Sequence, residues 1–161
     1  MKKPMSEQAA TQWLEELCAR SEQCRYDLAQ KLYKKGVSQE TAATILNHLE
    51  EQGFVNELRF ACAFVRDKYR FDRWGRKKIV SSLMLKRISR DSIDKALKEI
   101  DIKQYGLNCY NLLQSKRRQL NKITDPYDVK QRLLRFAAGR GYEPGLIIKL
   151  LDNPKLWDGE E

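Results

Sequence analysis

The sequence predicts an all-α protein, built as an elongated array of three tandem three-helix repeats with nine helices in total. Its 161 residues include only 8 Gly and 4 Pro, so residues that break helices are few. Hydrophobic residues make up 42% of the chain, which is enough to form a core in one short repeat array. Apolar residues also recur at the spacing of one helix face, and the whole pattern returns twice along the chain.

The clearest repeat lies in the last helix of each three-helix group. After Ser38, an i, i+3, i+4, i+7 stripe is formed by Ala42, Ile45, Leu46 and Leu49. The same stripe returns 51 positions later as Ile93, Ala96, Leu97 and Ile100. It returns 105 positions after the first as Ile147, Leu150 and Leu151, before Pro154 ends the pattern. We therefore expect one three-helix design in three copies.

The middle helices follow the same register. Their apolar positions are Leu28, Leu32 and Val37, then Ile79, Leu83 and Ile88, then Leu133, Ala137 and Tyr142. Gly36 and Gly141 stand where a left-handed residue would end the helix, and Arg87 is a less comfortable residue at that place. The next helices begin after N-cap residues or proline: Ser38, Ser89, and Glu143 with Pro144.

The opening helices complete the organisation. They are marked by Trp13, Leu14 and Leu17, by Phe60, Ala61, Phe64 and Val65 after the cap Asn56, and by Cys109, Tyr110, Leu112 and Leu113. Asp125 and Pro126 then start the middle helix of the third repeat. We assign the repeats to residues 1–55, 56–103 and 104–153, followed by a short acidic tail at 154–161.

Several function classes lack support in the sequence. The four cysteines (Cys18, Cys24, Cys62, Cys109) form no C-x-x-C, and the single histidine, His48, has no neighbouring ligand, so we expect no metal and no cofactor. No phosphate loop or nucleophile–base motif is present, so we expect no catalytic residues and no enzyme activity. No apolar run reaches the ~20 residues of a membrane span or resembles a secretory signal, which favours the cytoplasm.

Positive charge is concentrated in the middle of the chain. The net charge is +9, and residues 66–90 contain ten basic residues against only Asp67 and Asp72. Such a cluster indicates a polyanionic partner. The candidate contact residues in the cluster are Arg66, Lys68, Arg70, Arg73, Trp74, Arg76, Lys77 and Lys78.

Arg76, Lys77 and Lys78 fall at a predicted helix start, where the helix dipole disfavours cations. A basic helix start resembles an anion seat, with backbone N–H groups and side chains aimed at one phosphate. The cluster could contact nucleic acid, contact an acidic groove on a protein partner, or form an ordinary solvated face. We expect Phe71 to pack at the joint between helices, whereas Trp74 could equally pack there or stack on a base.

A basic residue also recurs once in each repeat, as Arg25, Arg76 and Lys130. Such a row would suit a helical polyanion, so Arg25 and Lys130 are added to the candidate contact residues. The run Lys116–Arg118 either extends this surface into the third repeat or is the exposed face of a long helix.

Together these residues resemble the RecX family over about residues 18–152. The most specific stretch is Gln52–Arg66, where a Gly-hydrophobic turn leads into Arg59-Phe60-Ala61. Gly75 followed by Ile79, and the basic-Gly-hydrophobic turns at Lys35–Val37 and Arg140–Tyr142, match further family motifs. The chain departs from the family at Lys86-Arg87-Ile88, where the family usually has Lys-Gly-Ile.

The resemblance implies a non-enzymatic negative regulator of the RecA recombinase. Such a protein binds in the helical groove of the RecA–DNA filament, inhibits recombinase and ATPase activity, and limits the SOS response and recombinational repair. Its expected partners are the RecA filament and single- and double-stranded DNA without sequence preference, and the family expectation is a monomer. The alternative is a sequence-independent nucleic-acid-binding helical module that acts without RecA.

Overall fold

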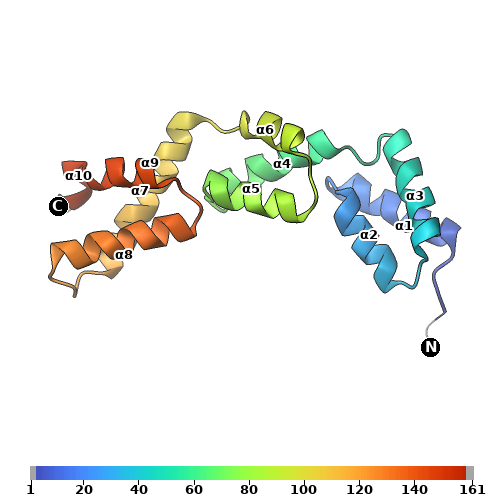
Figure 1. Ribbon diagram of the computed structural model, residues 1–161, viewed down its shortest axis with the longest axis horizontal. Helices are drawn as coiled ribbons and strands as arrows, with labels where there is room; N and C mark the ends of the chain where they lie inside the picture. Colours follow the sequence, from blue (N-terminus) through green and yellow to red (C-terminus); the bar gives the residue numbers. More distant parts are fainter. Residues whose placement is uncertain (1–2, 159–161) are drawn as a thin grey trace. The chain divides into compact units, whose positions relative to one another are not determined.

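The structure is a computed structural model that describes residues 3–158, and every regular element in this range is a helix (Figure 1). The helices are α1 (Glu7–Arg20), α2 (Arg25–Lys34), α3 (Gln39–Glu51), α4 (Glu57–Arg70), α5 (Arg76–Leu85), α6 (Arg90–Leu97), α7 (Ile102–Gln119), α8 (Pro126–Gly139), α9 (Pro144–Leu151) and α10 (Pro154–Trp157). No helix in this range is long and apolar enough to cross a membrane. The all-α fold class is confirmed.

The first nine helices match the nine predicted from the repeat, and α10 is an addition. The sequence predicts a short acidic tail at residues 154–161, but Asn153 caps a one-turn helix there by accepting a hydrogen bond from the Lys155 N–H. Leu156 on this helix is fully buried, which explains why the chain continues past Pro154 in helical form. The acidic residues Glu160 and Glu161 lie outside the described range.

The chain forms two compact units, and each is described here by itself. Unit 1 comprises Met1–Phe64 and Leu83–Ala96, and unit 2 comprises Val65–Ser82 and Leu97–Glu161. In unit 1, α3 packs against both α1 and α2. Their shared core contains Ala10, Leu14, Leu28, Leu32, Val37, Ile45, Leu46, Leu49 and Val55. Each of the larger side chains contributes roughly 1.5–3 kcal/mol by leaving water.

In unit 2, α8 packs against α7 and α9, and α10 packs against α7 and α9. Three tyrosines, Tyr69, Tyr105 and Tyr142, are its largest fully buried side chains. The rings of Tyr105 and Tyr142 lie with their centroids 5.1 Å apart. Asn108 is also buried, and its side-chain N–H donates to the carbonyl oxygen of Tyr69 over 2.8 Å. The core of this unit is therefore aromatic and hydrogen-bonded.

The turns confirm the repeat register. Gly36, Arg87 and Gly141 end the three middle helices with positive φ values of 78°, 60° and 97°. The apolar positions predicted for the middle helices are all buried, and so are most of the stripe positions in the last helices. Leu97 is an exception, because it is only partly buried.

The predicted N-caps are also largely confirmed. Ser38, Asn56, Ser89 and Asp125 each accept a hydrogen bond from a backbone N–H in the first turn of the following helix. Glu143 occupies the N-cap of α9 but makes no such bond. Its side chain is used elsewhere in unit 2.

Candidate nucleic-acid interface

The central basic cluster runs from the end of α4, through the loop at residues 71–75, into the first turn of α5. The side chains of Arg66, Lys68, Trp74, Arg76 and Lys78 are half-buried, and those of Arg70, Arg73 and Lys77 are exposed. All of them belong to unit 2. The eight predicted residues of this cluster therefore lie in one segment of unit 2, and three of them, Arg70, Arg73 and Lys77, are exposed cations.

The cations at the end of α4 are partly neutralised. Arg66 pairs with Glu99 at 3.4 Å, and Lys68 pairs with Asp72 at 2.9 Å. Both sit in the last turns of the helix, where the dipole favours positive charge. Arg70 donates to the hydroxyl of Tyr69 over 3.3 Å, so its guanidinium is also held near the helix end.

Two ammonium groups contact the ring of Trp74. The Nζ atoms of Lys68 and Lys78 lie 4.7 Å and 4.4 Å from the centre of its ring. Each cation–π contact is worth about 0.5–1 kcal/mol at a partly exposed site. The ring thus acts as a support that holds two positive charges in place.

The other two aromatic residues of the segment differ from Trp74. Phe71 is 78% exposed, so the prediction that it packs at the helix joint was wrong. It follows the last residue of α4 and lies in the turn rather than on the buried face of the helix. Tyr69 is 2% exposed and belongs to the core. Phe71 is therefore the aromatic side chain that this segment presents to solvent.

The predicted anion seat at the start of α5 is also wrong. The N–H of Gly75 donates to the carbonyl oxygen of Arg140 over 2.8 Å, and that of Lys77 donates to the carbonyl oxygen of Gly141 over 2.9 Å. The N–H of Arg76 donates to the Tyr105 hydroxyl over 2.9 Å. These donors are the groups that a phosphate would need, and the chain itself already occupies them.

Two glycines allow the turn after α8 to pack this closely against the start of α5. A Cβ atom added to Gly75 would overlap the backbone of Gly141, and one added to Gly141 would lie 2.5 Å from the backbone nitrogen of Lys78. Contacts this short do not occur between real Cβ atoms and backbone. Glycine at both positions therefore lets the turn after α8 dock directly on the start of α5.

Arg76 has a structural role in the same joint. Its guanidinium lies 4.2 Å from the centre of the Tyr105 ring and 3.2 Å from the Glu143 carboxylate. The Tyr105 hydroxyl donates to Glu143 over 2.7 Å. Burial raises the pKa of Tyr105 well above its usual range, so this hydroxyl remains a donor. The Glu143 carboxylate thus accepts from Arg76 and Tyr105, which explains why it does not cap the first turn of α9.

Arg73 is held through its backbone. Its φ is +56°, in the left-handed region, and its carbonyl oxygen accepts a hydrogen bond from the buried Tyr142 hydroxyl over 2.6 Å. Its side chain remains exposed. A residue 69 positions away therefore fixes the loop that presents Arg73 to solvent.

The predicted basic row has different surroundings in each repeat. Arg25, in unit 1, donates to Asn47 over 2.9 Å and to Glu50 over 3.0 Å. Lys130, in unit 2, has its Nζ 5.7 Å from the centre of the Trp157 ring on α10. Arg76 is half-buried, as described above. The three residues therefore share one position in the repeat, but their side chains make different contacts and are not equivalent free cations.

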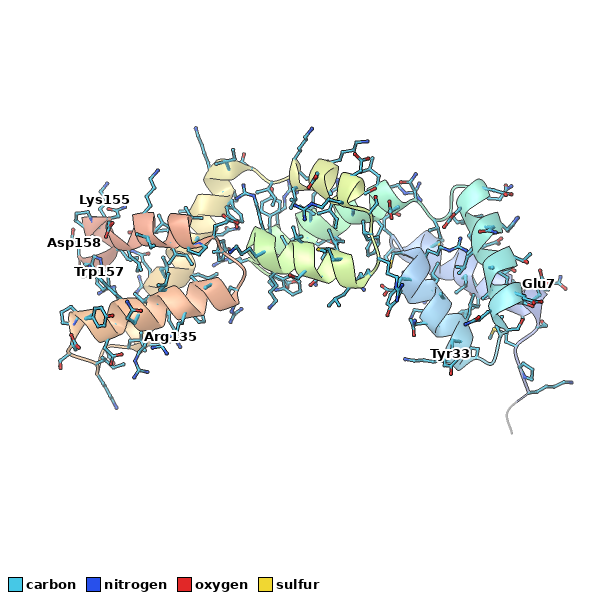
Figure 2. All side chains as sticks on the ribbon, viewed as in Figure 1. Glu7, Tyr33, Arg135, Lys155, Trp157 and Asp158 are labelled. Carbon is cyan, nitrogen blue, oxygen red and sulfur yellow. The ribbon has the colours of Figure 1, made fainter. Side chains whose placement is uncertain are left out.

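The third repeat also carries a basic groove, of whose residues only Lys116 was a candidate from the sequence. The groove has a volume of about 460 Å³ and is lined by Lys116, Leu120, Arg132, Arg135 and Phe136. Arg135 lies on α8 (Figure 2). The Phe136 ring lies between two cations, with Lys116 Nζ at 5.0 Å and Arg140 Cζ at 5.2 Å from its centre.

Arg140 connects this repeat-three groove with the loop of the central cluster: its guanidinium lies near the Phe136 ring, and its carbonyl oxygen accepts the hydrogen bond from the Gly75 N–H. Unit 2 thus carries two aromatic rings, Trp74 and Phe136, each flanked by two cations. The i, i+3, i+4 spacing of Arg132, Arg135 and Phe136 was a signal in the sequence. The packing of α8 beside the end of α7 was not visible there.

Comparison with known proteins relates this architecture to one family. The family model described as RecX, second three-helix domain, matches residues 56–97, and that of RecX, third three-helix domain, matches residues 108–151. The crystal structure of RecX from Lactobacillus salivarius superposes with a TM-score of 0.77 at 15% identity, covering 93% of this chain and 96% of that one. Another crystal structure of regulatory protein RecX gives a TM-score of 0.82 at 18% identity, covering 91% of this chain and 72% of that one.

Sequence relatives agree with the fold. Regulatory protein RecX of Pseudomonas tolaasii is 31% identical over 145 residues, which cover 89% of this chain and 90% of the relative. That of Clostridium botulinum (strain Alaska E43 / Type E3) is 34% identical over 118 residues, covering 73% of this chain. The chain spans only 55% of the length of this clostridial relative. The chain belongs to the RecX family of regulatory proteins.

Proposed function

We propose that this protein is a non-enzymatic negative regulator of the RecA recombinase that acts in the cytoplasm. In this proposal it binds as a monomer along the helical groove of the RecA–DNA filament and inhibits recombinase and ATPase activity. It would thereby limit the SOS response and recombinational repair. Membership of the RecX family supports the regulatory role, and a basic surface on a helical repeat scaffold supports a filamentous polyanion as the partner.

One observation carries the proposal furthest: the exposed cations Arg70, Arg73 and Lys77 lie in the same segment as Trp74, and Lys68 and Lys78 make cation–π contacts with its ring. These side chains offer phosphate contacts without any base-reading geometry, which suits a partner recognised independently of sequence. Regulation then requires that the protein bind one state of the filament better than another, because a ligand shifts an equilibrium only by its differential affinity.

The test is ATP hydrolysis by the cognate RecA on single-stranded DNA, titrated with this protein at physiological salt. Inhibition at well below one molecule per RecA protomer is the expected result, because a bound regulator blocks a filament of many protomers. Inhibition that appears only when the protein is abundant enough to cover the DNA would contradict the proposal.

A second candidate function is a nucleic-acid-binding module that acts without RecA, on single- or double-stranded DNA. The pairing of Phe136 with Lys116 and Arg140 favours it, because cation-flanked rings suit single strands. This candidate predicts no preference for a RecA-coated strand over a naked one. A direct comparison of the two affinities at one salt concentration separates the candidates.

A further inference from the structure

Arg87 adopts a left-handed backbone conformation, and the equivalent position in each of the other two repeats is a glycine. Its φ is +60°, whereas Gly36 and Gly141 at the equivalent turns have φ values of 78° and 97°. A side chain on Cβ is disfavoured in this region, and such strain persists mainly where the side chain has a use. The position therefore points to a role for the arginine side chain itself.

The guanidinium of Arg87 is available for a partner. The residue is exposed, and its Cζ lies 5.6 Å from the centre of the Tyr26 ring. Within residues 3–158, no carboxylate forms an ion pair with it. The neighbouring cation is already used, because Lys86 pairs with Asp27 at 2.7 Å. The Arg87 guanidinium thus contacts the Tyr26 ring but has no ion-pair partner among the described residues.

Arg87 lines a hollow of about 610 Å³ in unit 1. Apolar contributions come from Cys24, Ala29, Val55 and Ile88. Two carboxylates also line it, and both are occupied: Glu50 accepts from Arg25 over 3.0 Å, and Glu57 accepts from the hydroxyls of Ser89 and Ser92 over 2.8 Å each. A phosphate backbone would bring a row of negative charges past both carboxylates, whereas a peptide can bring a single acidic side chain to Arg87 and apolar side chains elsewhere.

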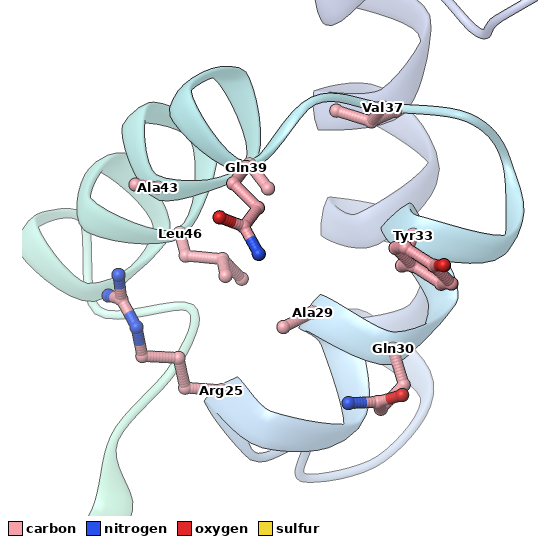
Figure 3. A pocket seen from close by; sticks show the side chains of 9 residues that line it. Arg25, Ala29, Gln30, Tyr33, Val37, Gln39, Ala43 and Leu46 are labelled. Carbon is pink, nitrogen blue, oxygen red and sulfur yellow. The ribbon is translucent and has the colours of Figure 1, made fainter.

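A second hollow continues this surface. It has a volume of about 430 Å³, shares Arg25 and Ala29 with the first, and lies between α2 and α3 (Figure 3). Its apolar lining residues include Val37, Ala42, Ala43 and Leu46, and no acidic residue lines it. Tyr33 at its edge is 75% exposed. We call the two hollows together the α2 groove.

We propose that the α2 groove docks a protein segment in which apolar side chains fill the hollows and an acidic side chain pairs with Arg87. The first hollow mixes apolar residues with charged ones, and of its three cations Arg25 and Lys86 already pair with carboxylates of this chain, which leaves the Arg87 guanidinium for an acidic side chain of the partner. The second hollow supplies an apolar lining without acidic residues. In this view, unit 1 contacts protein and unit 2 contacts the polyanion. The inference rests on the proposed function in taking the RecA filament as the first partner to test.

The first test compares wild type with Arg87→Gly. Because glycine relieves the left-handed strain, the melting temperature should rise by about 2–4 °C. Affinity for a RecA filament on single-stranded DNA should fall about tenfold, as arginine is often a major contributor at protein interfaces. Affinity for a naked oligothymidylate should not change. Arg90→Ala, which removes an exposed arginine of unit 1 that does not line the groove, serves as the matched control.

Three results would overturn the inference. Unchanged filament affinity would show that Arg87 has no partner there. An equal loss of affinity for naked oligothymidylate would mark Arg87 as a nucleic-acid contact. A lower melting temperature would remove the argument from strain.

A second experiment does not depend on RecA. A random peptide library displayed on phage is selected against wild type and against Arg87→Gly. Wild type should enrich apolar peptides with an acidic residue, and Arg87→Gly should not. If the filament measurement fails for wild type itself, the proposed function fails, and this selection alone decides the inference. Selection of no Arg87-dependent peptides would then reject it.

Discussion

The hydroxyl of Tyr142 donates to the carbonyl oxygen of Arg73 over 2.6 Å. This bond links the turn between α8 and α9 to the exposed basic loop between α4 and α5. Tyr142 itself is fully buried, whereas the Arg73 side chain is exposed. The surface that we propose to contact the filament is therefore shaped by a core residue.

Replacing Tyr142 by Phe tests this link. The ring stays, and the loss of one hydrogen bond should cost about 1 kcal/mol of unfolding free energy. Because the Arg73 loop loses its tether, filament affinity should fall by more than the small loss of folded protein explains. Urea denaturation and filament-binding titrations measure the two effects. Affinity equal to wild type in fully folded Tyr142→Phe would contradict a positioning role.

Gly75→Ala should be strongly destabilising. The added methyl group would overlap the Gly141 backbone, which cannot move without breaking the hydrogen bonds at the start of α5, so we expect a loss of roughly 1–3 kcal/mol. Gly106→Ala is the matched control: it lies inside α7 with nothing within 4 Å of the new Cβ. That change should stabilise the helix by about 0.5–1 kcal/mol. Thermal unfolding of both variants checks the contrast.

Glu57 should make unit 1 sensitive to acid. Burial alone would raise the pKa of Glu57, but hydrogen bonds from Ser92 and Ser89 outweigh it and hold the pKa below its ordinary value. A depressed pKa contributes stability above the unfolded value of about 4.3, and this contribution is lost as pH falls through the folded value. The gap in melting temperature between wild type and Glu57→Gln should therefore shrink as pH falls from about 6 to about 3.

The control for this titration is Glu40→Gln, at an exposed residue in the first turn of α3. Its difference from wild type should remain small throughout the same pH range. A gap for Glu57→Gln that stays constant with pH would show that the carboxylate charge is not the stabilising element.

Reversing the three exposed cations should abolish tight filament binding. With Arg70, Arg73 and Lys77 changed to Glu, folding should be nearly unaffected, since surface changes usually stay within about ±0.5 kcal/mol each. The salt dependence of single-strand binding should become shallower by about two, at ~0.7 for each phosphate that the variant no longer neutralises. A triple reversal of the exposed residues Lys103, Lys149 and Lys155 matches the change in charge. Equal losses of affinity in both triple variants would show that binding depends on the net charge of the protein and not on these three residues.

The repeat-three groove gives a length-dependent prediction. Lys116→Glu combined with Arg135→Glu should weaken binding of a strand of about 20 nucleotides much more than one of about 5, because a short strand can be held by the central cluster alone. Fluorescence anisotropy at fixed salt measures both affinities. A loss of affinity that is independent of length would mean that the groove is not a continuation of the central cluster.

The helical repeats were predictable because burial imposes a spacing on the sequence. Leu28, Ile79 and Leu133 occupy one position in three copies, and all three are fully buried. Even the strain at Arg87 could be anticipated, since glycine occupies its two equivalents. Local pattern and internal repetition were sufficient for these features.

The candidate site was less predictable because its decisive contacts are distant in the sequence. The N–H of Arg76 is paired with Tyr105, 29 positions away, so reasoning from the helix dipole alone suggested a free anion seat. The exposure of Phe71 depends on where α4 ends, and a hydrophobic residue there could equally have packed. The groove around Phe136 required knowing which face of α8 lies beside α7.

The pairing of the backbone N–H groups at the start of α5 also has a consequence for synthesis of the chain. The N–H of Arg76 pairs with Tyr105, and those of Gly75 and Lys77 pair with the turn at Arg140 and Gly141, which leave the ribosome later. Until then the basic segment that begins α5 has open backbone donors beside Arg76, Lys77 and Lys78, and a nascent chain would expose the anion seat that the finished protein lacks. A chain truncated before residue 140 would lack the acceptors for the Gly75 and Lys77 N–H groups, so these two donors would stay open beside the basic side chains and should raise its affinity for polyanions above that of the full chain.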